Sequence, residues 1–265
     1  MRRRHLFEFN DSAFTPPALR DTLIESLSLA LKWGRIFERA VEPFARFLDA
    51  CGATEVLDLC AGAGQPAAIF AREFLREGRR PPRFLMCDLF PRVEAWRRLA
   101  AELPDVIGFV EEPVDATRID PGLGRGRARV IVNALHHFPP AVARDILLGA
   151  AAEAPGVFVL ETLPRNPLHF AAFAPWGLAG MLALPLVTPE QRAKKALLSW
   201  LTPVGVATAA WDGTVSTLRA HEEADLREMV APLGDAWTWT WGTFPWSGGL
   251  GRGSYFAGVP RRSPR

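Results

Sequence analysis

The sequence predicts an α/β protein with a doubly wound, mostly parallel seven-stranded sheet and an antiparallel C-terminal strand. Short apolar runs alternate with helical patterns between residues 54 and 163, which is typical of βαβ units. The first of these runs ends in the glycine-rich loop Gly62-Ala63-Gly64. Near the C-terminus, Trp237, Trp239 and Trp241 alternate with threonines, and a glycine-rich loop leads into a further strand. That period of two predicts an antiparallel pair that closes the sheet.

The bulk composition excludes several protein classes. The chain has 265 residues and a net charge of +2, so charge gives no reason to expect a nucleic-acid partner. Three sparse cysteines without metal-ligand spacing argue against a zinc site and fit a reducing compartment. No apolar segment follows the first residues, so we expect no signal peptide and a cytoplasmic protein. The terminal basic residues are expected to be solvated tails: Arg2, Arg3, Arg4, Arg261, Arg262 and Arg265.

Four regions follow one another along the chain. Residues 1–53 are expected to form a helical cap, in which Thr15 caps a helix and leucines recur every four residues from Leu19 to Leu31. Residues 54–163 form the α/β core. Residues 164–211 interrupt the alternation with an apolar insertion, and residues 212–265 return to the core with a turn at Asp212-Gly213, a helix and a β-hairpin.

The core is expected to contain five strands joined by helices. The strands are predicted at residues 55–60, 83–88, 106–110, 128–134 and 157–160, and the helices at 66–77, 92–102 and 140–153. Because crossovers between parallel strands are right-handed, the carboxyl ends of these strands should share one edge of the sheet. Ligands of open α/β sheets bind at that edge.

The apolar insertion has no charged residue from Pro167 to Val187. Its 21 residues are enough to cross a bilayer, but three prolines and two glycines weaken a helix of that length. We expect a lid that lines an apolar acceptor site. Peripheral membrane contact through 167–187 and a dimer interface remain alternatives, and the oligomeric state is open.

Carboxylates follow the first three core strands. Asp58 lies at the end of the first strand, Asp88 ends the second, and Asp115 follows the third. The pattern Gly62-x-Gly64-x-x-Ala67 also fits a looser dinucleotide fingerprint. However, residues 58–71 contain no Lys or Arg to meet a pyrophosphate. Three acids at one sheet edge therefore favour a nucleoside ligand that carries positive charge.

Four segments, in order, resemble the motifs of class I S-adenosylmethionine (SAM)-dependent methyltransferases. The run from Val56 to Gly64 resembles motif I, with Cys60 where the family usually has its first glycine. Residues 87–91, 113–116 and 133–138 are similar to the motifs after strands two, three and four. The resemblance implies that SAM is the cofactor, S-adenosylhomocysteine the product, and that no metal takes part. It implies cofactor contacts by Asp58, Cys60, Ala61, Gly62, Gly64, Asp88, Leu89, Asp115, Ala116 and Asn133.

His136 and His137 follow the fourth strand, where methyl donor and acceptor should meet. A hydroxyl acceptor profits from a base, and histidine has a suitable pKa near neutral pH. Three interpretations stay open for the pair: general base, substrate contact, or structural packing. The acceptor is expected to be a small or medium, largely apolar molecule that is methylated on oxygen rather than on nitrogen or carbon. An Asn-Pro-Pro-Tyr motif is absent at this position, which disfavours a nucleic-acid base as acceptor.

Two other functions compete. An NAD(P)-dependent oxidoreductase would be expected to carry a Tyr-x-x-x-Lys pair, but the only tyrosine is Tyr255 and lysines occur at 32, 194 and 195 alone. A non-catalytic module that binds SAM or lipid stays open, because the sequence predicts binding more directly than turnover.

Overall fold

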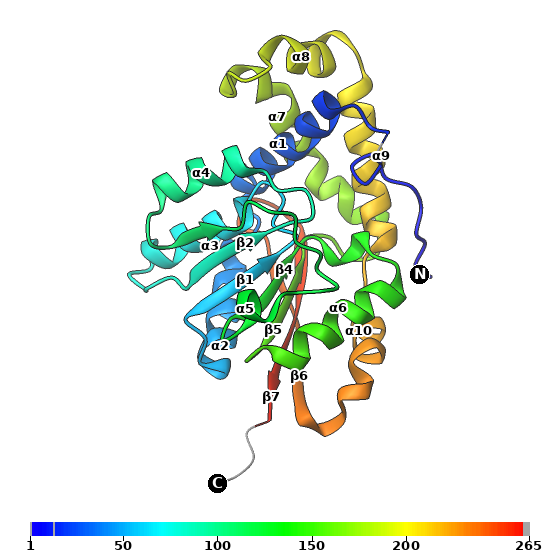
Figure 1. Cartoon of the computed structure of the whole chain (residues 1–265). Coiled ribbons are helices and arrows are strands. Elements are labelled where there is room, and N and C mark those ends of the chain that lie inside the picture. The colour runs from blue at the N-terminus through cyan, green and yellow to red at the C-terminus, as the bar shows by residue number, and fades with distance from the viewer. Residues whose placement is uncertain (1, 13, 262–265) are drawn as a thin grey trace.

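The computed structural model describes residues 2–12 and 14–261, and within them a seven-stranded sheet has the order β3-β2-β1-β4-β5-β7-β6 (Figure 1). The strands are β1 (Glu55–Leu59), β2 (Arg83–Cys87), β3 (Ile107–Phe109), β4 (Ala128–Val132), β5 (Val157–Glu161), β6 (Trp237–Pro245) and β7 (Arg252–Pro260). Strands β1 to β5 are parallel, whereas β7 pairs antiparallel with β5 and β6. The predicted fold class is confirmed.

Helices cover both faces of the sheet. They are α1 (Pro17–Trp33), α2 (Val41–Cys51), α3 (Gln65–Arg76), α4 (Val93–Glu102), α5 (Pro121–Gly124), α6 (Pro140–Glu153), α7 (Pro167–Val187), α8 (Arg192–Ala196), α9 (Val204–Arg219) and α10 (Glu223–Val230). Short helical turns are η1 (Glu38–Ala40), η2 (Leu135–His137), η3 (Leu197–Leu201) and η4 (Ala231–Ala236). The predicted helices at 66–77, 92–102 and 140–153 correspond to α3, α4 and α6.

Two hydrophobic cores result from the alternation of side chains along the strands. Val56 packs with α2, α3 and α4 on one face, while its neighbour Leu57 packs with α6 and α10 on the other. On the first face the ring of Phe44 lies 4.8 Å from that of Phe70 and 5.1 Å from that of Phe158. Both faces of the parallel strands are therefore buried, which fits their nearly continuous apolar sequences.

A third layer lies beyond the carboxyl ends of the parallel strands. Helices α1, α7 and α9 pack against one another there, with α8 at the far end of the molecule (Figure 1). Gly180 of α7 permits the close approach to α1, because a Cβ at this position would lie 2.5 Å from the carbonyl oxygen of Ser26. The apolar side chains of this layer therefore cover the edge of the sheet at which ligands of open α/β sheets bind.

The apolar insertion is more regular than the sequence suggested. α7 runs unbroken for 21 residues, with Pro175 and Pro185 inside it. The contacts with α1 and α9 hold the segment helical although two backbone hydrogen bonds are lost. By length and composition α7 could cross a membrane: its most apolar 18-residue window has a mean hydropathy of 1.7 and is 28% buried.

The predicted turn at Asp212-Gly213 is wrong, because both residues lie within α9. The Asp212 carboxylate accepts hydrogen bonds from the N-terminal segment, and Gly213 provides room for Phe170, whose ring would lie 2.1 Å from a Cβ. Here Asp-Gly marks a close contact rather than a turn. The predicted boundary between residues 211 and 212 consequently falls inside a helix.

Two predictions at the N-terminus are also wrong. Thr15 caps no helix: α1 starts after Pro16, and the Thr15 hydroxyl donates to the carbonyl of Phe9 at 2.6 Å. Arg3 is not a solvated tail, since its guanidinium donates to the carbonyls of Arg219 (2.6 Å) and Phe138 (2.9 Å). Arg262 and Arg265 lie outside the described residues.

Candidate functional site

The loop after β1 has a left-handed backbone at three residues. The φ angles are 60° at Cys60, 53° at Gly62 and 77° at Gly64. A Cβ at Gly64 would lie 2.7 Å from Sδ of Met86, so only glycine fits between the loop and β2. A Cβ at Gly62 would meet nothing within 4 Å, since this residue faces open space. The loop thus packs through Gly64 and presents Gly62.

Asp88 borders this loop from the end of β2. Its Oδ2 accepts the backbone N–H of Gly62 at 2.9 Å, and its Oδ1 accepts that of Phe90 at 2.9 Å. A carboxylate has about four lone-pair positions, so two remain for a ligand. The side chain is held where it can accept hydrogen bonds from both hydroxyls of a ribose.

Asp58 lies beneath the loop rather than on the cavity wall. It is 2% exposed, and burial, together with the charge of Asp88, raises the pKa of Asp58 to about 8. Burial likewise raises the pKa of the neighbouring Cys60 thiol. Any effect of Asp58 on a ligand must therefore pass through the loop.

Asp115 and Asn133 hold the backbone at the other strand ends. Oδ1 of Asp115 accepts both the N–H and the hydroxyl of Thr117, at 2.8 and 2.7 Å, so this residue caps a turn beside the cavity. Asn133 has a φ of 55°, and its Oδ1 accepts the N–H of Thr162 at 3.2 Å. This bond joins the carboxyl ends of β4 and β5.

A cavity of about 1400 Å³ extends from the glycine loop into the space between α1, α7 and α9. Of the predicted cofactor residues, Asp58 and Gly64 do not line it, whereas the other eight do: Cys60, Ala61, Gly62, Asp88, Leu89, Asp115, Ala116 and Asn133. Their contact with a cofactor stays a prediction. The far end of the cavity is walled by apolar side chains, among them Leu27, Phe170, Leu178 and Met181.

His136 stands where the two ends of the cavity meet. Its Nδ1 lies 2.7 Å from Oε2 of Glu161, and its backbone N–H donates to Oε1 of the same residue at 3.1 Å. Glu161 ends β5, and its pKa is lowered by His136 although burial opposes this. The carboxylate therefore fixes the orientation of the ring.

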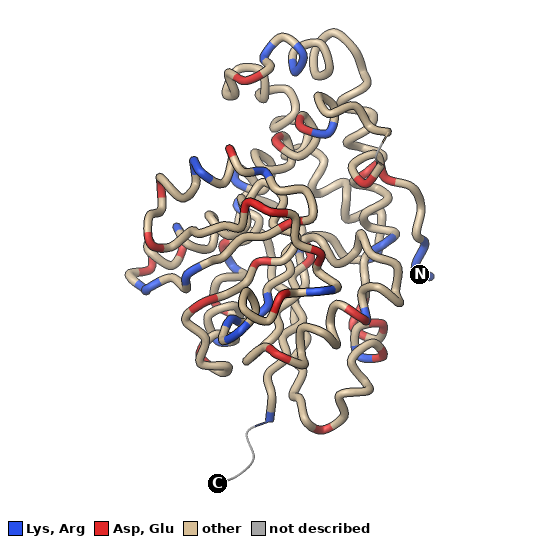
Figure 2. The backbone as a smooth tube through the Cα atoms, in the orientation of Figure 1, with Lys and Arg blue, Asp and Glu red and all other residues tan. Residues whose placement is uncertain are grey.

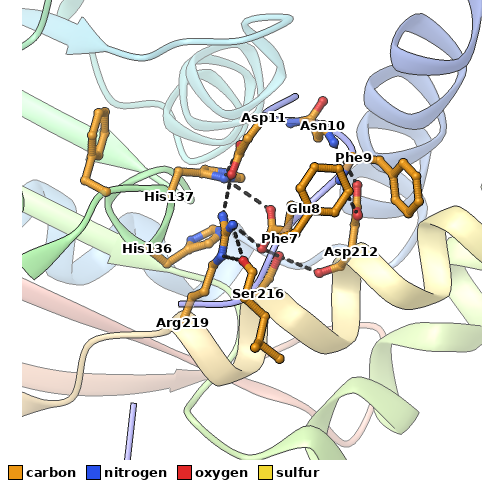
Figure 3. Close-up of polar contacts among 12 residues, drawn as sticks. Phe7, Glu8, Phe9, Asn10, Asp11, His136, His137, Asp212, Ser216 and Arg219 are labelled. Carbon is orange, nitrogen blue, oxygen red and sulfur yellow. Dashed lines mark hydrogen bonds and ion pairs between the residues drawn. The ribbon is translucent and has the colours of Figure 1, made fainter. Parts of the chain in front are cut away.

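His137 faces two carboxylates from the N-terminal segment (Figure 3). Its Nδ1 lies 2.9 Å from Oδ1 of Asp11 and 3.2 Å from Oε2 of Glu8. Burial alone would lower the pKa of His137, but these carboxylates raise it to about 10. His137 is thus a cation at neutral pH, and its ring centre lies 4.2 Å from that of His136.

Sequence reasoning missed the partners of the histidines. Glu8, Asp11 and Glu161 were not among the predicted site residues, yet all three line the cavity. The sequence contains one signal of the N-terminal carboxylates: polar residues follow Leu6-Phe7 directly and end the apolar run. Nothing in the spacing shows that residue 8 lies beside residue 137.

Over the described residues, basic and acidic positions are interspersed along the backbone (Figure 2). Within the site, Glu8, His136 and His137 offer metal-ligating atoms that lie within 4.8 Å of one another. Arg219 pairs with Asp11 and lies 3.5 Å from Oε1 of Glu8, so the group has cations of its own.

No protein-family model and no curated protein matches the sequence. Solved structures do. Magnesium protoporphyrin IX methyltransferase from Synechocystis PCC 6803, solved with bound SAM, is 14% identical, with a TM-score of 0.52 over 96% of this chain and 93% of that one. A Nostoc punctiforme PCC 73102 protein assigned as an O-methyltransferase is 13% identical, with a TM-score of 0.53 over 97% of this chain and 64% of that one. The chain therefore has the fold of class I SAM-dependent methyltransferases.

Proposed function

We propose that the protein transfers a methyl group from SAM to the oxygen of a small or medium, largely apolar acceptor. The observation that carries this proposal is a continuous cavity, which joins the loop at Gly62 and Asp88 to the buried pair His136–Glu161. The first part suits a nucleoside, and the second suits proton removal from an acceptor.

The charges at the loop favour SAM over a dinucleotide. Residues 58–71 carry no basic side chain for a pyrophosphate. Arg92 lines the cavity nearby, but it pairs with Asp21 at 2.9 Å. Carboxylates at the strand ends stabilise a ligand with a positive sulfur. The SAM-bound methyltransferase of the same fold supports this assignment.

Methyl transfer is an in-line displacement, in which an acceptor oxygen attacks the methyl carbon and S-adenosylhomocysteine leaves. Most of the rate gain comes from holding the two reactants in line. A hydroxyl acceptor must also lose its proton, and His136 is placed to take it. Glu161 would stabilise the resulting imidazolium, since its carboxylate already accepts the hydrogen bond from Nδ1.

The walls and size of the cavity set the class of acceptor. About 1400 Å³ exceeds the usual 300–1000 Å³ of a small-molecule site, so room remains beside a cofactor. The chamber under α7 is apolar, and burial of apolar surface contributes about 25 cal/mol per Å². These features support an acceptor with an apolar body and one polar group that reaches His136.

Isothermal titration calorimetry with SAM, S-adenosylhomocysteine and NADH tests the donor. We expect micromolar binding of the first two, at least tenfold weaker in Asp88→Ala, which is about 1.4 kcal/mol. Incubation with SAM and 4-nonylphenol, an apolar phenol, then tests methylation of oxygen. Tight NADH binding without SAM binding would overturn the proposed methyl transfer and favour an NAD(P)-dependent oxidoreductase. SAM binding without turnover on any of a panel of alkylphenols would favour a binding module.

We also propose that α7 rests on a lipid surface from which an apolar acceptor enters. Leu182 and Leu186 lie four residues apart on α7, do not line the cavity, and are 42% and 67% exposed. Trp200 and Leu201 of η3 are exposed as well. Flotation with phosphatidylcholine vesicles should recover the wild-type protein and not Leu182→Glu/Leu186→Glu. Equal recovery of both would show that this face does not bind lipid.

A further inference from the structure

We call the part of the cavity lined by His136, His137, α7 and α9 the acceptor end. The N-terminal segment, residues Arg3 to Asp11, contributes Glu8 and Asp11 to its lining. Asp212 of α9 accepts the backbone N–H groups of Phe9 and Asn10 at 2.9 and 3.0 Å. Arg219 donates to the carbonyl of Leu6, and Trp211 donates to that of Phe7 at 2.9 Å. The backbone of the segment is therefore hydrogen-bonded to side chains of α9 on both sides of Glu8.

Glu8 is the buried member of this segment. It is 1% exposed, and a buried carboxylate is costly unless it is paired. Its Oε1 accepts the hydroxyl of Ser216 at 3.1 Å and lies 3.5 Å from Arg219, while its Oε2 faces His137 at 3.2 Å. Burial acts to raise the pKa of Glu8, but His137 lowers it below its usual value. Both oxygens of an ionised carboxylate are thus committed to the site.

A line of contacts runs from Glu8 to the proposed reacting atoms. Glu8 faces His137, whose ring packs on that of His136 at 4.2 Å between centres and 35° between planes. Nδ1 of His136 is held by Glu161. In Figure 3 dashed lines join the carboxylates of Glu8 and Asp11 to His137 of η2 and Arg219 of α9. Displacement of His137 would free one side of the His136 ring.

We propose that Glu8 is the positioning residue of the histidine pair, so that the N-terminal segment is a working part of the active site. Glu161 holds Nδ1 of His136, and Glu8, through His137, holds the face of the same ring, so that both together set the direction in which His136 meets the acceptor. This inference rests on the proposed function in one respect, the contact between His136 and the acceptor. The glycine loop at Gly62 and Asp88, which we call the donor loop, plays no part in this inference, because SAM would be bound there, at the other end of the cavity.

The same atoms could instead be read as metal ligands. Arg219 and a protonated His137 already balance the carboxylates of Glu8 and Asp11, so positioning requires no metal. Measurements after treatment with EDTA separate the two readings.

Nuclear magnetic resonance of the full chain with ¹⁵N-labelled histidine tests the positioning directly, without an acceptor. The variants are Glu8→Gln, which removes the charge at constant shape, and Glu8→Asp, which keeps it. Glu228→Gln on the exposed side of α10 is the matched control. In Glu8→Gln we expect the pKa of His137 to fall by at least one unit and the ring signals of His136 to shift. Glu8→Asp should restore part of both changes.

Activity and cofactor binding complete the test. In Glu8→Gln we expect SAM affinity within twofold of wild type and kcat for 4-nonylphenol at least tenfold lower, with a smaller change in KM. Glu8→Asp should recover part of kcat, and Glu228→Gln all of it. A merely structural role would weaken SAM binding and stability without this split.

Three results would overturn the proposal: unchanged histidine signals in Glu8→Gln, a loss of SAM affinity that parallels the loss of kcat, or wild-type signals that change on EDTA treatment. If Glu8→Gln does not fold, Asp11→Asn removes the other, more exposed partner of His137. Asp11→Asn should move the His137 signals in the same direction, and unmoved signals would again contradict the proposal. If SAM binds but no alkylphenol is methylated, the proposed function fails while the histidine signals still decide the role of Glu8.

Discussion

The two ends of the cavity are built in different ways. The donor end consists of the segments that follow β1, β2, β3 and β4, so its polar residues lie within a few residues of the end of a strand. The acceptor end joins segments that are far apart in sequence, such as Glu8, His137 and Arg219. A site made of loops can be read from local spacing, whereas a site made of packed helices cannot.

The largest expected effect separates chemistry at the acceptor end from binding at the donor end. His136→Gln should lower the rate of methyl transfer to 4-nonylphenol by about 10²–10⁴, the usual contribution of a general base. SAM affinity should stay within twofold, because the donor loop is untouched. Single-turnover kinetics and calorimetry measure the two quantities. Equal losses of rate and affinity would show that the two ends are not separable, and His169→Gln on α7 serves as the control for removal of a histidine.

Gly64→Ala is expected to destabilise the donor end. The residue has a φ of 77°, and the new Cβ would lie 2.7 Å from Sδ of Met86. Strain and overpacking together should lower the free energy of unfolding by about 2–4 kcal/mol, as measured in urea. Gly62→Ala shares the left-handed backbone but has open space around it, so its loss should be smaller. Similar losses in both variants would mean that the contact with Met86 is unimportant.

Gly180→Ala tests the packing of α7 against α1 in the helical layer above the sheet. Its Cβ would lie 2.5 Å from the carbonyl oxygen of Ser26, which forces α7 away from α1. We expect a loss of about 1–3 kcal/mol. Gly177→Ala, on the same helix, meets Phe173 at an ordinary 3.5 Å and should be neutral or slightly stabilising. A stabilising Gly180→Ala would contradict the close packing of these helices.

Asp58→Asn should change the stability by an amount that depends on pH. The folded-state pKa of about 8 lies above the value of about 4 for an unfolded chain. The stability contributed by the neutral carboxyl is therefore full below pH 4 and is lost as the pH rises towards 8. Thermal unfolding should show Asp58→Asn more stable than wild type at pH 7.5 and close to it at pH 4. A pH-independent difference would contradict burial of an ionisable Asp58.

The sheet and the donor loop can be predicted from the amino-acid sequence alone. Apolar runs of strand length, Gly62 and Gly64, and an acid after each of three strands sufficed, because parallel strands bring their carboxyl ends to a common edge. The sequence also identified His136 and His137, since they follow β4 directly. Burial of Asp58 beneath the loop was not predictable, because spacing along a strand does not say whether a carboxylate meets the cavity or the core.

The acceptor end of the cavity depends on how the helices pack in three dimensions. The sequence indicated a broken insertion and a turn at Asp212-Gly213, yet α7 and α9 are continuous, since neighbouring helices stabilise a conformation that local propensity disfavours. Their packing on α1 brings Arg219 and Asp212 to the N-terminal segment, and that segment places Glu8 beside His137. Such pairings depend on where whole helices lie, and no local pattern in the chain encodes them.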